Sequence, residues 1–255
     1  MAVVALASAS GSPGVTTTAL GLALLWPRPV LLVEADPTGG SGLLAGYFRG
    51  TREYDAGLIE LALTADNLSD ALADVARPIE GTQASFVAGT RSHTQASALR
   101  DLWAPLAEAL GELESTGQDV IVDAGRLGLN GSPESLLDSA DLALLVSRTT
   151  LPALSALRPW ADASQRPPLD WHQAGVLLVG EGQPYGAREV ATVVDLPVVA
   201  SLPDDPESAA VFSRGAAPPK RFDSGPLVRG INAAIASIHS TITHRRNTLL
   251  EGAQS

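Results

Sequence analysis

The stretch Ser8–Leu25, "SASGSPGVTTTALGLALL", places small residues and threonines between two apolar runs. The run before it, Val3–Ala7, is typical of a buried strand, and Ala19–Leu25 is typical of a buried helix. Small residues let backbone N–H groups approach an anion, and a helix N-terminus adds the positive end of its dipole. The stretch therefore predicts a strand, a phosphate-binding loop and a helix, which together form the first unit of an α/β domain.

The loop departs from the common phosphate-loop pattern at one position. That pattern, G-x-x-x-x-G-K-[S/T], has a lysine directly before the hydroxyl residue. This chain has Val15 there, followed by Thr16 and Thr17. Lys220 is the one lysine in the sequence, so no displaced lysine stands nearby along the chain. On the loop alone, an ordinary glycine-serine turn that caps a helix is an equal alternative.

The remainder of the chain alternates between apolar strands and helices. The strands are continuous apolar runs, which are typical of a parallel sheet buried on both faces. We therefore expect one α/β, three-layer P-loop NTPase-like domain over residues 1–246, with a mostly parallel central sheet and helices on both faces, and a flexible tail over 247–255. The further strands predicted are Val30–Asp36, Ser85–Gly89, Asp119–Gly125, Leu142–Ser147, Ala174–Gly180 and Leu196–Pro203. The further helices predicted are Gly57–Leu63, Leu68–Ala76 with Ser69 as its cap, Ala96–Ser115, Ala153–Ala163, Ala187–Val194 and Pro226–Arg246.

Composition narrows the class of protein. The absence of cysteine excludes disulfides, thiolate zinc sites and cysteine nucleophiles. A net charge of −11 with scattered arginines disfavours direct DNA binding, which needs a basic face. The N-terminus lacks the basic region of a signal peptide, and no apolar run reaches the ~18 residues of a membrane span. These features predict a cytoplasmic protein.

The C-terminal end leaves a second location open. His244, Arg245 and Arg246 precede Leu249 and Leu250, a mixture of basic and apolar residues that can lie on a membrane surface. No aromatic anchor accompanies them, and a core-packing helix is the simpler interpretation. Peripheral contact with the inner face of the cell membrane is the weaker alternative.

From Ala2 to about Ser240, the order of motifs resembles the ParA/MinD family of deviant-P-loop ATPases, of the SIMIBI class. The loop of that family reads roughly K-G-G-x-G-K-T-T. Ser10 stands at its signature lysine and Val15 at its loop lysine, so the loop resembles a degenerate Walker A sequence. The matching residues are Gly11, Gly14, Thr16 and Thr17.

Two strands that end in acids extend the resemblance. The segment "VLLVEADPTGG" from Val30 is similar to the family's V-L-L-I-D-x-D-P-Q-G, with Glu34 at its first acid and Asp36 at its second. The segment "DVIVDAG" is similar to the next acidic strand, with Asp123 at the Mg²⁺-linked aspartate. The resemblance implies that Asp36 helps to order an attacking water, and that Thr16 and Asp123 hold Mg²⁺.

A late segment, Val194–Pro218, resembles the stretch that borders the nucleotide base in that family. The strand before it resembles one that ends in an adenine-reading asparagine, but Gly180 and Glu181 stand there. The resemblance implies ATP and Mg²⁺ as ligands. The nucleotide-binding residues that it implies are Gly11, Ser12, Gly14, Val15, Thr16 and Thr17.

Two arginines are candidates to replace the missing positive charge at the nucleotide. Arg126 and Arg148 each stand at the carboxyl end of a predicted strand, where a parallel sheet forms its binding crevice. The simpler interpretation is that both are solvated loop residues.

The missing lysines decide the expected function. Positioned cations oppose the charge of phosphoryl transfer and contribute factors on the order of 10³–10⁵. We expect a pseudo-ATPase: a dimerising scaffold that positions cell machinery through a protein partner in a membrane-associated machine. The loop resembles that of the TadZ/CpaE-like pilus-localisation branch, which suggests a pilus or secretion machine. The alternatives are an active ATP-dependent dimer switch that uses arginine, and, with less support, a dethiobiotin-synthetase-type enzyme.

Overall fold

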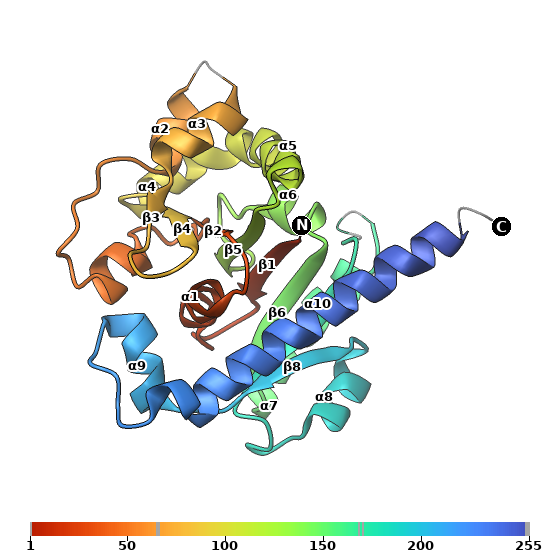
Figure 1. The fold of residues 1–255 in the computed structure, drawn as a ribbon. Coiled ribbons are helices and arrows are strands. Elements are labelled where there is room, and N and C mark those ends of the chain that lie inside the picture. Colours follow the sequence, from red (N-terminus) through yellow and green to blue (C-terminus); the bar gives the residue numbers. More distant parts are fainter. Residues whose placement is uncertain (1, 65–66, 168, 170, 253–255) are drawn as a thin grey trace.

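The computed structural model describes residues 2–64, 67–167, 169 and 171–252, and in them eight strands form one sheet (Figure 1). The strand order is β3-β4-β2-β5-β1-β6-β7-β8, and every neighbouring pair is parallel except β3 with β4. The predicted mostly parallel α/β sheet is confirmed. The strands are β1 Val3–Ser8, β2 Val30–Glu34, β3 Arg77–Pro78, β4 Ala84–Val87, β5 Asp119–Arg126, β6 Leu142–Arg148, β7 Ala174–Val179 and β8 Val198–Leu202.

Helices cover both faces of this sheet. The α-helices are α1 Val15–Leu25, α2 Leu58–Leu63, α3 Leu68–Val75, α4 His93–Ala96, α5 Trp103–Glu112, α6 Glu134–Asp138, α7 Leu151–Ser164, α8 Ala187–Val194, α9 Pro206–Arg214 and α10 Pro226–Gly252. A π-helical turn, η1 Leu43–Tyr47, and three 3₁₀ segments, η2 Ser97–Leu102, η3 Leu113–Thr116 and η4 Phe222–Ser224, complete the regular structure. None of the described helices is long and apolar enough to cross a bilayer.

The side chains of β1 point alternately into two apolar clusters, because the sheet is buried on both faces. Val3 and Ala5 belong to an apolar cluster shared with α2, α3 and α5–α8, whereas Val4 and Leu6 belong to a second cluster shared with α1, α9 and α10. Successive strand residues point to opposite faces, so a strand covered on both faces has to be apolar throughout. This is the three-layer arrangement that the continuous apolar runs predict.

Helix α10 reaches the sheet by crossing α1 at a glycine. A Cβ on Gly21 would lie 2.9 Å from Cδ1 of Ile231, so a larger residue would require the Ile231 side chain to shift. Figure 1 shows α10 crossing this face and running on toward the C-terminus. The helix continues to Gly252, past residue 246, where the sequence predicts that the folded domain ends.

Two helical predictions were wrong in detail. The predicted helix over residues 96–115 is instead the last residue of α4, followed by η2, α5 and η3 in succession. Pro105 cannot donate a backbone hydrogen bond, and it is tolerated because α5 begins at Trp103 and places it in the first turn. The cap of α3 is Asn67, whose side chain accepts from the backbone N–H of Ser69. Ser69 itself lies inside the helix.

A buried carboxylate ties down the end of the sheet opposite the loop. Asp119, fully buried at the start of β5, accepts hydrogen bonds from the Ala2 N–H (2.6 Å) and the Trp26 Nε1–H (2.7 Å). Arg28 adds a forked contact, with its Nε 3.0 Å from Oδ2 and its Nη2 2.7 Å from Oδ1. Arg28 is therefore the cation that compensates this buried charge.

We expect Arg28→Ala to lower the free energy of unfolding by about 1–3 kcal/mol, because it leaves Asp119 buried without a cation. This value is below that of a fully buried pair because the Arg28 side chain is 44% exposed. Urea unfolding measures the loss, with Arg166→Ala as the control for removal of an exposed arginine. Equal losses in the two variants would contradict this role for Arg28.

Candidate functional site

The loop between β1 and α1 has the backbone shape of an anion cradle. Gly11 and Gly14 adopt φ angles of +67° and +103°, a region that favours glycine. Gly14 is the N-cap of α1, and its carbonyl accepts the first helical hydrogen bond from the Thr18 N–H at 2.8 Å. The free N–H groups of the first turn are the groups that bind phosphates at helix N-termini.

Val15 lies in the core instead of the cradle. Its side chain is 7% exposed and belongs to the apolar cluster that α1 shares with α9 and α10. Any contact between Val15 and a phosphate would therefore have to come from its backbone. Thr16 and Thr17, which follow it, are both half-buried and line two different cavities.

The smaller cavity, about 160 Å³, gathers the predicted acids around Thr16. Parallel pairing explains the meeting, because β5 lies between β1 and β2 and Asp123 pairs with Glu34 and with Leu6. Asp36, just beyond β2, completes the acidic wall. The structure thus brings together Thr16, Asp36 and Asp123, as the resemblance implies.

Asp123 is a carboxylate held out of water. It is 1% exposed, and burial raises its pKa to about 7, with further increases from the charges of Asp36 and Glu34. Hydrogen bonds with the Thr16 side chain and the Gly125 N–H lower this pKa. Because its charge is poorly solvated, Asp123 is primed to gain from a nearby cation.

Glu34 is also buried, but its carboxylate is fully used by the protein. The hydroxyl of Ser41 and the backbone N–H of Leu43 (2.9 Å) and Gly89 (3.4 Å) donate to it. Burial raises its pKa, and these hydrogen bonds oppose the rise. Glu34 therefore fixes the start of η1 against the end of β2, a role that its position in a motif does not reveal.

Asp36 lies directly against the end of β5. Its Oδ1 accepts from the Thr38 N–H at 2.8 Å. A Cβ on Gly125 would lie only 2.2 Å from Cγ of Asp36, and Gly125 has a φ of +62°. Only glycine satisfies both conditions, which explains the glycine after Asp123.

Thr16 and Asp123 fit a magnesium ion that is shared with phosphates. Mg²⁺ prefers one or two carboxylates, with water and substrate oxygens at its remaining positions. A hydroxyl beside a single desolvated carboxylate offers this donor set. No group of three or more histidines or acids in the described part of the chain could hold a metal ion.

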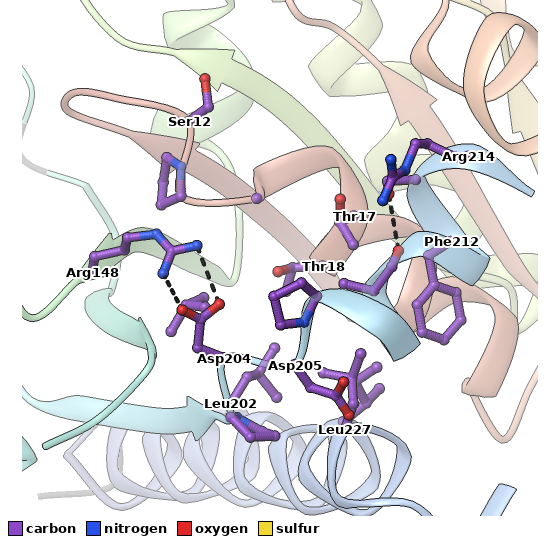
Figure 2. Close-up of a pocket in the computed structure, with 18 residues that line it drawn as sticks. Ser12, Thr17, Thr18, Arg148, Leu202, Asp204, Asp205, Phe212, Arg214 and Leu227 are labelled. Atoms are coloured by element: carbon purple, nitrogen blue, oxygen red, sulfur yellow. Dashed lines mark hydrogen bonds and ion pairs between the residues drawn. The ribbon is translucent and has the colours of Figure 1, made fainter. Parts of the chain in front are cut away.

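A second cavity of about 510 Å³ opens on the other side of the loop (Figure 2). Ser12, Gly14 and Thr17 line it from the loop and α1. The late segment supplies the opposite wall, through the end of β8 and through α9. Its apolar lining includes Leu202, Phe212, Leu227 and Ile231.

The two arginine candidates lie in different surroundings. Arg148, at the end of β6, lines the larger cavity but is held by Asp204, at 2.7 Å and 3.3 Å from its two Nη atoms (Figure 2). Arg126, the exposed last residue of β5, lines neither of the two cavities. Sequence reasoning missed Arg214, the last residue of α9, which also lines the larger cavity.

No known family and no curated protein matches the sequence, but solved structures match the fold. The cell division ATPase MinD of Pyrococcus furiosus superposes with a TM-score of 0.73 at 18% identity, over 94% of this chain and 98% of that one. MinD in the MinC:MinD complex of Aquifex aeolicus gives 0.74 at 13% identity, over 94% and 96%. A ParA family ATPase from Chlorobium tepidum gives 0.68 at 13% identity, over 93% and 98%. The fold is that of the ParA/MinD ATPases.

We expect Asp123→Asn to flatten the dependence of stability on pH. The pKa of Asp123 rises from 3.8 to about 7 on folding, so its protonated form stabilises the folded state. That contribution is complete below pH ~4 and is lost as the pH rises through about 7, at about 1.4 kcal/mol per pKa unit. The variant stays neutral and should lose most of this slope.

Urea unfolding in Mg²⁺-free buffer between pH 5 and 8 measures the effect. Glu34 titrates in the same direction and supplies the residual slope. The matched control is Asp101→Asn, which removes an exposed carboxylate. Identical slopes in wild type and Asp123→Asn would show that Asp123 is not desolvated in solution.

Proposed function

We propose that this chain is a ParA/MinD-like positioning protein that binds a nucleoside triphosphate weakly and hydrolyses it very slowly or not at all. One observation carries the proposal: the backbone cradle is complete, while Val15 places an apolar side chain in the core at the position of the loop lysine. The loop therefore has the backbone conformation of a phosphate-binding loop but lacks the lysine that would bind the phosphate.

The remaining groups support binding more than catalysis. Backbone N–H groups and the α1 dipole attract an anion, and Thr16 with Asp123 offers ligands to Mg²⁺. Asp36 lies where it could orient a water, beside Gly125 and within the acidic cavity. Without the loop lysine, one of the positioned cations that oppose the charge of phosphoryl transfer is lost, which favours slow turnover.

The scaffold part of the proposal comes from the fold. One solved neighbour is a MinC:MinD cell division complex, and another is a plasmid partition protein of Borrelia burgdorferi with a TM-score of 0.67 at 11% identity, over 94% of this chain and 99% of that one. We infer that this chain engages a protein partner in a membrane-associated machine, and that it does so as a homodimer. The loop resemblance to TadZ/CpaE-like proteins favours a pilus or secretion machine.

An active switch that uses arginine is the second candidate function. The observation in its favour is that Arg148 lines the same cavity as the loop. Its forked ion pair with Asp204 already uses that charge, and Arg126 lies outside both cavities. Neither of the two arginines predicted at strand ends therefore supports an active switch better than a pseudo-ATPase.

Val15→Lys should strengthen binding of ATP by about tenfold or more, because one charge-assisted hydrogen bond to phosphate contributes about 1.5–3 kcal/mol. This requires the aliphatic stem of the lysine to lie along the apolar neighbours of residue 15 while its ammonium reaches the loop. Val15→Met is the matched control, since it has similar length without charge. Titration of a fluorescent ATP analogue in Mg²⁺ measures the affinities, and thermal melting checks folding.

Two outcomes of that titration would oppose the proposal. Micromolar binding by the wild type together with ATP turnover would exclude a pseudo-ATPase. Equal affinities in Val15→Lys and Val15→Met would show that the missing lysine does not limit binding.

We expect the wild type to dimerise without turnover. Sedimentation velocity with and without ATP and Mg²⁺ measures the association, and phosphate release measures turnover in the same samples. A monomer at all concentrations up to ~100 μM, well above typical specific affinities, would exclude the dimerising scaffold. A fluorescent fusion that is diffuse throughout the cell would exclude the positioning role.

A further inference from the structure

The larger cavity contains an arginine with no carboxylate partner. Arg214 and Arg148 both line it, but only Arg148 forms an ion pair. Of the nearby acids, Asp204 holds Arg148, and Asp205 caps α9 by accepting from the Ser208 N–H at 3.1 Å. In the described part of the chain, Arg214 is therefore an exposed arginine without an ion pair at a wall of this cavity.

The backbone that carries Arg214 is fixed by two close contacts with η1. A Cβ on Gly46 would lie 2.4 Å from the Ser213 carbonyl oxygen, and a Cβ on Gly215 would lie 2.2 Å from the Tyr47 carbonyl oxygen. Gly215 also adopts the left-handed conformation that ends α9. These contacts hold both neighbours of Arg214 against η1 and set the direction from which its side chain leaves the helix.

The cavity has two chemically different parts. Ser12, Gly14 and Thr17 supply hydroxyl and backbone groups at the phosphate cradle, whereas Leu202 and Leu227 supply an apolar lining. Figure 2 shows Arg214 on the side where Thr17 lies and Arg148 with Asp204 on the other. A ligand with an anionic end and a flat apolar end, such as a nucleoside triphosphate, matches this division.

We propose that Arg214 binds the phosphate groups of a nucleoside triphosphate, and so supplies from α9 the positive charge that Val15 does not supply from the loop. This inference rests on the nucleotide binding proposed above and adds the residue that gives it charge. A guanidinium suits the task, because its planar fork matches phosphate oxygens in a bidentate contact. Arg214 is a binding residue here, with no role assigned in bond breaking.

The test compares Arg214→Ala with Arg188→Ala, which removes an exposed arginine from α8. The probes are ATP with Mg²⁺ and inorganic tripolyphosphate, the latter as a competitor that has no base. We expect Arg214→Ala to weaken both by about tenfold to a hundredfold, as for loss of a charge-assisted hydrogen bond. Arg188→Ala should bind both as the wild type does, and Arg214→Lys should retain part of the affinity.

Each other outcome has a distinct meaning. If the wild type binds ATP and Arg214→Ala binds both probes equally well, the role of Arg214 is overturned while the proposed function stands. If Arg214→Ala weakens ATP but leaves tripolyphosphate unchanged, Arg214 contacts the base or ribose and the phosphate role is overturned. If the wild type binds neither probe, both the role of Arg214 and the proposed nucleotide binding fail. Thermal melting of each variant separates misfolding from loss of contact.

Discussion

Burial of one parallel sheet on both faces is the constraint on which the rest of the structure depends. It requires strands that are apolar throughout, as the alternation of Val3, Val4 and Ala5 between two clusters shows. The buried acids Asp119 and Glu34 are then the first residue of β5 and the last residue of β2. At one end of the sheet, Asp119 accepts hydrogen bonds from Ala2, Trp26 and Arg28. At the other end, the parallel direction of β1, β2 and β5 gathers the loop and the acids.

The two buried acids at that second end, Glu34 and Asp123, differ in the hydrogen bonds that oppose their desolvation. Glu34 accepts hydrogen bonds from the start of η1 and from Gly89, which hold η1 against β2 and offset part of its desolvation, although burial still raises its pKa. Asp123 has the Thr16 hydroxyl and one backbone N–H, which offset only part of its desolvation, so burial raises its pKa to about 7. Asp123 is therefore the buried acid that the proposed site for a cation shared with phosphates would use.

Much of the fold could be predicted from the sequence, because apolar runs in a doubly buried sheet are long and unambiguous. Asp36 and Asp123 could be placed in the same way, because Asp36 closely follows β2 and Asp123 lies in β5, whereas the phosphate-loop pattern places Thr16 at the start of α1. The missed features depend on tertiary contacts. The 3₁₀ segment η2 replaces the first turns of the helix that the apolar stripe predicts, and α9 is short and begins within an acidic segment. Arg214 lies at the end of a helix, so no strand-end rule points to it, and only the fold brings it to the loop's cavity.

The position of this arginine changes what ligand binding would move. A lysine on the loop would join a phosphate to α1, which is already fixed in the core. Arg214 joins it to α9, whose end packs through Ser213 and Gly215 on η1, and η1 begins at the residues that donate to Glu34. Phosphate, α9, η1 and the acidic cavity would then form one contiguous set of contacts. A scaffold requires a surface that differs between the nucleotide-bound and free states, and it does not require turnover. A ligand that contacts α9 in one state and not in the other is sufficient to produce such a difference.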